Sequence, residues 1–302
     1  LVELSWGADY NIVEHCRLVQ PIRNTTSENM SAIFSEQGSN NSHNDDYNII
    51  RNNYMAGGGH GIRWYGYSTS AADREQGNIF TGNTIRDYYY MGIRYYYGEN
   101  LQISDNLITN NSSRTDTYGL YMFRNYQRNE ISRNRIIATN AAYYGIYMDD
   151  CDGSADNFML VANNYIYLAR TTSRAWGLYI LDNNFAQFIY NTATVVSNST
   201  TDGRAWYSTG SASPMTVLNN NFANLGAGYA AYYNSTNSFG TVDHNNYYTT
   251  GANLTYWSGN RADLAAQQSG SGRDANSVSA DPQLDAAGEP YLTSVVLNGA
   301  AL

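Results

Sequence analysis

The stretch YYGIYMDD, from Tyr143 to Asp150, joins a glycine to an alternating run of apolar and aromatic residues. Similar phrases recur along the chain: GIRWY from Gly61, GIRYY from Gly92, GLYMF from Gly119 and GLYIL from Gly177. Alternation with a period of two residues indicates a β-strand. The sequence therefore predicts that one kind of strand is repeated several times.

A second phrase accompanies these strands and reads apolar, two spacers, Asn, any residue, apolar. An example is ISDNLI, from Ile103 to Ile108. Stacked Asn side chains at this slot can hydrogen-bond to one another, and Asn tolerates left-handed backbone. With Cys and Thr as substitutes, the slot is assigned to Cys16, Asn53, Asn83, Asn106, Asn134, Asn164, Thr192, Asn220 and Asn245.

The spacing of the slot varies from 23 residues (83 to 106) to 37 residues (16 to 53). Helical repeats keep a constant length, whereas short strands with variable connections are typical of a parallel β-helix. The alternative is a β-sandwich with Asn-rich loops. A sandwich would not repeat the same two phrases in the same order, so the solenoid is favoured.

The combined pattern N-x-I … G-I-x-x … N-x-I-x-x-N-x-I, over roughly residues 6 to 250, resembles the right-handed parallel β-helix repeat of pectin-lyase-like proteins. The tail, with SGRDANSVSADPQLD, resembles the end of large secreted bacterial surface proteins, where a D-x-N-S … D-P element closes the helix. The resemblance implies an all-β fold: a single right-handed parallel β-helix of about nine coils with an irregular C-terminal closing segment. It does not select a function, because this fold hosts lyases, hydrolases, adhesins and inert spacers.

The expected organisation is a solenoid over residues 1–250 and a capping segment over residues 251–302, with the whole chain a piece of a longer polypeptide. The capping segment contains NRADLAAQQSG, which predicts a short helix. Asn260 or Asp263 would begin this helix and Gly270 would end it.

Alternate residues of a strand face opposite sides. The residue after each small residue is assigned to the core: Ile62, Ile93, Leu120, Ile146, Leu178, Ala205 and Ala231. The next residue then faces outward, which predicts a column of Arg63, Arg94, Tyr121, Tyr147, Tyr179, Trp206 and Tyr232.

Two interpretations of this column remain open. Its members could simply pack on one another, as same-face neighbours in a sheet do. They could also bind a glycan, since aromatic faces pack on sugar rings and Arg binds carboxylates bidentately. The adjacent Arg63 and Arg94 would favour an acidic polysaccharide.

Candidate catalytic residues are few. GGGHGI, with His60, and NDDY, with Asp45 and Asp46, resemble the Gly-His-Gly and acidic pair of polygalacturonase-type hydrolases. The Asn-Thr-Asp-Gly and Arg-Ile-Lys segments of that family are missing from the sequence. A lyase needs a base beside a charge-neutralising group. Because the chain has no Lys, its lyase candidates are His60, Arg63 and Arg94.

The segment DDCDGSAD contains Asp149, Asp150, Asp152 and Asp156. Carboxylate oxygens suit a hard cation, so this loop is a candidate calcium site. A solvated acidic loop is the alternative. No sequence motif requires a cofactor.

Composition limits the partners. The formal net charge is −9, and all 17 basic residues are scattered Arg, which argues against nucleic acid as a partner. No apolar run reaches the ~20 residues of a membrane span. Cys16 and Cys151 fall about four coils apart, ~19 Å at ~4.8 Å per coil, too far for a disulfide.

The sequence thus predicts a secreted or cell-surface module that is structural or adhesin-like and able to bind glycans through the outward column. The alternative is a polysaccharide lyase, or less favourably a hydrolase, acting on an acidic polysaccharide. Expected partners are a polysaccharide or other surface proteins, within a larger polypeptide or assembly.

Overall fold

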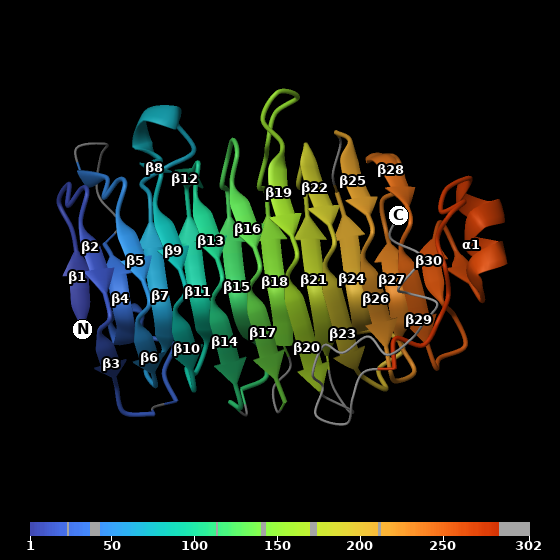
Figure 1. The fold of residues 1–302 in the computed structure, drawn as a ribbon, viewed down its shortest axis with the longest axis horizontal. Helices are drawn as coiled ribbons and strands as arrows, with labels where there is room; N and C mark the ends of the chain where they lie inside the picture. Colours follow the sequence, from blue (N-terminus) through green and yellow to red (C-terminus); the bar gives the residue numbers. More distant parts are fainter. Residues whose placement is uncertain are drawn as a thin grey trace.

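The computed structural model describes residues 1–22, 24–36, 43–112, 114–139, 143–169, 174–210 and 213–283. Its strands form a solenoid that runs from the N-terminal coil at the left of Figure 1 to the C-terminal coil at the right. Three long sheets extend along the solenoid, and sheets B and C have nine strands each. The predicted single solenoid of about nine coils is confirmed.

Sheet A occupies the centre of Figure 1 and is parallel except for its last pair of strands. Its strands are β1 (Val2–Leu4), β4 (Ser31–Ser35), β7 (His60–Tyr65), β11 (Met91–Tyr96), β15 (Thr117–Phe123), β18 (Tyr143–Asp149), β21 (Ala175–Leu181), β24 (Gly203–Thr209), β27 (Tyr229–Tyr233), β30 (Thr255–Trp257) and β31 (Asn260–Arg261).

Sheets B and C complete each coil. Sheet B contains β2 (Ile12–Glu14), β5 (Ile49–Arg51), β9 (Ile79–Thr81), β13 (Gln102–Ser104), β16 (Glu130–Ser132), β19 (Met159–Ala162), β22 (Ala186–Ile189), β25 (Met215–Leu218) and β28 (Phe239–Asp243). Sheet C contains β3 (Arg17–Val19), β6 (Tyr54–Ala56), β10 (Thr84–Arg86), β14 (Leu107–Asn110), β17 (Arg135–Ala138), β20 (Tyr165–Ala169), β23 (Thr192–Val196), β26 (Asn221–Asn224) and β29 (Asn246–Thr249).

A few short elements lie outside these sheets. Strands β8 (Glu75–Gln76) and β12 (Gly98–Glu99) pair on the connections between sheets A and B. Over the part of the chain that the structure describes, 3-10 turns occur at η1 (Glu28–Met30) and η3 (Ala71–Asp73). Among the described helices, none has the length and apolar character that crossing a bilayer requires.

The repeated glycine is required by close packing between coils. A Cβ atom on Gly145 would lie 2.5 Å from the carbonyl oxygen of Gly177 and 2.5 Å from Cγ2 of Ile166 in sheet C. The residue after the glycine also faces inward, and the predicted core residues Ile93, Leu120, Ile146 and Leu178 are aligned and fully buried. The glycine phrase therefore marks where sheet A contacts the core side chains of sheet C.

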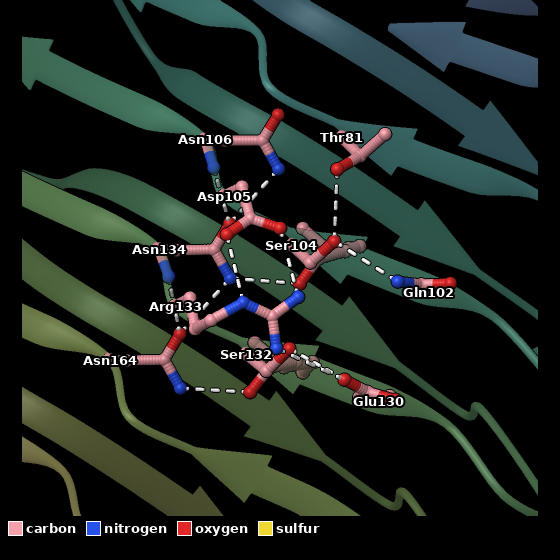
Figure 2. Close-up of polar contacts among 12 residues, drawn as sticks. Thr81, Gln102, Ser104, Asp105, Asn106, Glu130, Ser132, Arg133, Asn134 and Asn164 are labelled. Atoms are coloured by element: carbon pink, nitrogen blue, oxygen red, sulfur yellow. Dashed lines mark hydrogen bonds and ion pairs between the residues drawn. The ribbon is translucent and has the colours of Figure 1, made fainter.

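An asparagine ladder lines the turn between sheets B and C (Figure 2). Oδ1 of Asn134 accepts hydrogen bonds from the backbone N (3.2 Å) and Nδ2 (2.9 Å) of Asn106. Nδ2 of Asn134 donates to the carbonyl oxygen of Ile103 and to Oδ1 of Asn164. Each coil is thus hydrogen-bonded to its neighbours by one side chain.

Two details of the predicted ladder are wrong. Asn191, and not Thr192, fills the seventh slot: it accepts from the backbone N of Asn164 at 3.1 Å. The left-handed residue is the one before the slot, as at Arg133 and Asn163, and not the slot residue itself. A turn of this kind places the side chain after the left-handed residue over the core, where it can reach both neighbouring coils.

The C-terminal end is closed by helix α1 (Leu264–Ser271), which packs on β30 and β31. The side chain of Asp263 caps its first turn, as predicted. The predicted end at Gly270 is wrong, because the helix continues to Ser271 and stops at Gly272, whose φ is 67°. Ser277, from the D-x-N-S element, ends the ladder: its Oγ accepts from the backbone N of Asn245.

Candidate functional site

The outward column of sheet A is the candidate site. Six of the seven predicted residues are aligned in register on successive strands: Arg63, Arg94, Tyr121, Tyr147, Tyr179 and, after one intervening strand, Tyr232. Trp206 is the exception and is a correction. It is aligned with Leu178, is fully buried, and donates from Nε1 to Oγ of Ser208. Tyr207 takes its place between Tyr179 and Tyr232, and Tyr256 extends the column.

The rings of this column stack face to face from Tyr121 to Tyr207 and again between Tyr232 and Tyr256, whereas Tyr207 and Tyr232 are tilted, with centroids 5.8 Å apart. The centroids of Tyr121 and Tyr147 are 4.7 Å apart with an interplanar angle of 10°, and those of Tyr147 and Tyr179 are 4.9 Å apart at 6°. Tyr179 and Tyr207 are 4.6 Å apart. Tyr147 and Tyr179 therefore have another ring on both faces, so mainly their ring edges and hydroxyl groups face outward.

A second outward column runs beside the first. It consists of the residues that come directly before the Gly or Ala of each strand: Tyr118, Tyr144, Trp176, Arg204 and Tyr229. Tyr118 and Tyr144 stack at 4.6 Å and 6°, and Tyr144 packs on Trp176 at 4.5 Å. The two columns touch edge to face, as Tyr144 does with Tyr147 at 5.3 Å and 84°. From β15 to β21 the face of sheet A is thus a continuous layer of rings in contact.

Packing keeps the tyrosine hydroxyls neutral. Partial burial, with a contribution from the neighbouring Tyr207, raises the pKa of Tyr179 to about 12. Partial burial also raises the pKa of Tyr121 and Tyr147. These groups can donate and accept hydrogen bonds, but they cannot act as bases near neutral pH.

The two arginines at the start of the column share one carboxylate. Glu28, on η1, accepts from Nη1 of Arg63 with Oε2 and from Nη1 of Arg94 with Oε1, each at 2.6 Å. Arg94 also donates to the hydroxyl of Tyr65. The side chains of Arg63 and Arg94 are only 7% and 12% exposed. Although partial burial acts in the opposite direction, the arginines hold the pKa of Glu28 below its ordinary value.

His60 lies in the same row as the second column, aligned with Met91. It is fully buried, and its Nε2 is 3.5 Å from the carbonyl oxygen of Thr26. Burial, together with the charge of Arg94, lowers its pKa to about 4, so the imidazole is neutral near pH 7. A neutral imidazole has the protonation state of a general base, but this one has no access to solvent.

The structure separates the parts of the hydrolase-like signature. Asp45 accepts a hydrogen bond at 2.7 Å from Ser35, the last residue of β4. His60 is aligned with Ser31, the first residue of that strand. Four residues of strand are ~13 Å long. Asp45 and His60 therefore lie near opposite ends of the strands of sheet A, in neighbouring coils.

The acidic loop distributes its carboxylates among different partners. Asp150 pairs with Arg124 at 3.0 Å, and Oδ1 of Asp152 accepts from Nδ2 of Asn184 at 2.8 Å. Asp149 accepts from the hydroxyl of Tyr147 at 3.4 Å, and Asp156 is exposed. Over the residues that the structure describes, no three or more His, Cys, Asp or Glu side chains are grouped to hold a metal ion. Calcium binding here stays a prediction.

The two cysteines have the state that the sequence predicts. Cys16 is a free, exposed thiol at the N-terminal end of the asparagine ladder, where its backbone N donates to Oδ1 of Asn53. Cys151 is free and fully buried, and burial raises its pKa to about 12. Cys151 therefore lacks the low pKa of a nucleophilic thiol.

Comparison with known families agrees with this geometry. A family model described as a right-handed β-helix region matches residues 11–193, more than half of the chain. The chain belongs to the right-handed β-helix family. Neither the curated proteins nor the solved structures yielded a match to it.

Sequence reasoning missed three features of the candidate site on this right-handed β-helix. The residue that belongs in the first column is Tyr207, one residue after the predicted Trp206. The second column was not recognised, although an aromatic residue or Arg precedes the small residue (Gly or Ala) in five successive strands from β15 to β27. Glu28 lies 35 residues before Arg63 on an irregular segment, and no pattern in the sequence pairs them.

Proposed function

We propose that this right-handed β-helix is a secreted or cell-surface module that supplies length and rigidity, in the manner of a stalk or adhesin, and performs no reaction. The observation that carries the proposal is the stacking of the tyrosine column. Ring-on-ring contacts join successive coils on the outer face of sheet A, and the asparagine ladder joins them at the turn between sheets B and C. Both arrangements oppose bending and separation of coils.

The placement of the candidate lyase residues also supports a non-catalytic module. Arg63 and Arg94 share Glu28 as their ion-pair partner and are largely buried, and His60 is buried beside Thr26. A lyase mechanism would require Glu28 to leave both arginines and His60 to become accessible. The location outside the cell, and the place within a larger polypeptide or assembly, follow from the resemblance of the tail to bacterial surface proteins.

Glycan binding by the same face is the second candidate. It is favoured by the row of tyrosine edges, whose neutral hydroxyls could hydrogen-bond to sugar hydroxyls. Ring faces would contribute little, because neighbouring rings cover them. Because Glu28 already pairs with both Arg63 and Arg94, the expected ligands of this face are neutral glycans and not acidic ones.

The test combines a product assay with binding measurements. We expect no unsaturated product from a panel of uronate polysaccharides. Product formation that His60→Ala abolishes would overturn the non-catalytic role. Binding of neutral glycans that Tyr147→Phe weakens would establish the second candidate, because this variant keeps the ring and removes only the hydroxyl.

A further inference from the structure

The stacking of the first column is interrupted beside Arg204, on β24. The rings of Tyr207 and Tyr232 are neighbours in this column, but they are tilted by 31° and their centroids lie 5.8 Å apart. The centroids of Tyr179 and Tyr207, by comparison, are 4.6 Å apart. Cζ of Arg204 lies 3.9 Å from the centroid of Tyr232 and 4.9 Å from that of Tyr207. A cation therefore packs on the two rings at the place where they separate.

The guanidinium of Arg204 has no carboxylate partner. Over the part of the chain that the structure describes, no Asp or Glu side chain forms an ion pair with it, and Asp202, two residues earlier, accepts a hydrogen bond from Oγ1 of Thr201 at 3.2 Å. Nε of Arg204 is buried and has no hydrogen-bond partner among the described residues. Burial lowers the pKa of Arg204, and the charge of Asp202 only partly offsets this effect. The positive charge is therefore incompletely compensated within the chain.

The other two arginines of the columns are occupied. Arg63 and Arg94 share Glu28, and their side chains are only 7% and 12% exposed. Strand β24 lies four strands beyond β11, which carries Arg94, so the two sites are ~19 Å apart along sheet A. Among the three arginines of the two columns, Arg204 is thus the one available to an anion.

A second unpaired donor lies beside Arg204. Trp176, on β21, is aligned with it in the second column. The side chain of Trp176 is 6% exposed, and its Nε1 is buried without a hydrogen-bond partner among the described residues. Buried polar groups of native proteins normally have partners. Donors therefore exceed acceptors where β21 and β24 meet, as expected of a surface that takes an acceptor from outside the chain.

The surroundings of Arg204 define this acceptor. A guanidinium binds a carboxylate through two parallel hydrogen bonds. The tilted rings of Tyr207 and Tyr232 offer apolar surface to the C–H groups beside such a carboxylate. Arg204 supplies a single charge, and the formal net charge of the chain is −9, so a polymer with a charge on every residue is repelled. One acidic sugar combines a single carboxylate with C–H surface.

We propose that Arg204 binds the carboxylate of a single acidic sugar, at the end of an otherwise neutral glycan. The proposal rests on the second candidate function, glycan binding by sheet A, and names the one acidic group that this face accepts. Because Glu28 closes Arg63 and Arg94 to acidic groups, the acidic residue lies over β24 and β27.

Saturation-transfer NMR with single sugars tests the site. The acidic ligands are the methyl glycosides of glucuronic acid, galacturonic acid and N-acetylneuraminic acid, and the neutral ligands are methyl glucoside and methyl galactoside. We expect at least one acidic glycoside to bind the wild-type chain with a Kd on the order of 1 mM, about tenfold more tightly than the neutral glycosides. Because the contact is a partly exposed ion pair, raising the ionic strength should weaken it.

Arg204→Gln removes the charge and keeps most of the length of the side chain. It should weaken binding of the acidic glycosides about tenfold and leave the neutral glycosides as they are. Arg51→Gln is the matched control, because it removes the same charge from an exposed ion pair with Glu14 on sheet B. The control should leave both classes of ligand unchanged, and near-ultraviolet circular dichroism reports whether the tyrosine packing is intact in each variant.

The outcomes separate this proposal from the function on which it rests. If neutral glycosides bind and acidic ones bind no more tightly, or if Arg204→Gln does not weaken acidic ligands, the proposal is wrong although the chain binds glycans. If neither class binds, the proposal and the second candidate function both fail. Acetate that binds as tightly as the acidic glycosides would also overturn the proposal, because the sugar would then contribute nothing.

Discussion

The rings of Tyr147 and Tyr179 lie parallel, with 4.9 Å between their centroids and an angle of 6° between their planes. This separation is that of neighbouring strands in a sheet. The backbone spacing of the solenoid therefore sets the ring spacing, and each tyrosine fills the space above the one before it. Contacts of this kind contribute to stability along the whole column.

Removing one ring should cost stability. Tyr147 stacks on Tyr121 and Tyr179 and touches Tyr144 edge to face. We expect Tyr147→Ala to lower the free energy of unfolding by about 1–2 kcal/mol, and Tyr147→Phe to have little effect, because the contacts belong to the ring. Denaturant melts measure both. Tyr67→Ala, at a 40% exposed ring on a loop, is the control. Equal stability of Tyr147→Ala and wild type would contradict the packing role.

The asparagine ladder predicts a larger effect. Asn134→Ala leaves the backbone N of Asn106 and the carbonyl oxygen of Ile103 without partners inside the solenoid. At ~1–3 kcal/mol for each buried unpaired group, we expect a loss of about 2–5 kcal/mol by urea unfolding. Asn163→Gly, at the exposed left-handed position before the next slot, should change stability by only a few tenths of a kcal/mol. Similar losses in the two variants would argue against the ladder.

Stability should depend on pH through Asp46. Burial and the nearby Asp9 and Asp45 raise its pKa to about 6, although a hydrogen bond from the backbone N of Gln76 acts in the opposite direction. The folded state then binds a proton more tightly than the unfolded chain does, so stability falls as pH rises from about 4 to about 6. Because the group is partly exposed, the expected change is about 1 kcal/mol.

Asp46→Asn should flatten the melting temperature over this pH interval. The exposed Asp156→Asn removes the same charge and should leave the pH profile as it is in the wild type. A wild-type profile that rises between pH 4 and 6, or one that Asp46→Asn does not alter, would refute the assignment.

Calcium binding at the loop of Asp149, Asp150, Asp152 and Asp156 has a direct test. A ligand that binds only the folded state raises the melting temperature, so a bound calcium ion predicts a lower melting temperature after chelation. Asp150 would have to leave Arg124 to join such a site. Identical melting curves with and without a chelator, and on addition of millimolar calcium, would show that this loop binds no calcium.

The sequence predictions were accurate where the repeated phrases are complete and less accurate where they are not. Where glycine and Asn phrases recur in full, as from Gly92 to Leu181, strand positions and inward residues were predicted correctly. The errors lie where the phrase is ambiguous. GRAWY contains two small residues, and the structure aligns Gly203 with Ala175, so that Ala205 takes the glycine slot and Trp206 becomes core. A shift of one residue exchanges the two faces of a strand.

The sequence by itself determined the solenoid, its number of coils and most of its core, because these depend on short patterns that each coil repeats. Only the tertiary structure decided how the outward residues are used. Whether Tyr147 offers its face or its edge depends on the rings above and below it, and whether Arg94 can bind an anion depends on Glu28, 66 residues earlier in the chain. Such contacts join different coils, and no local pattern carries them.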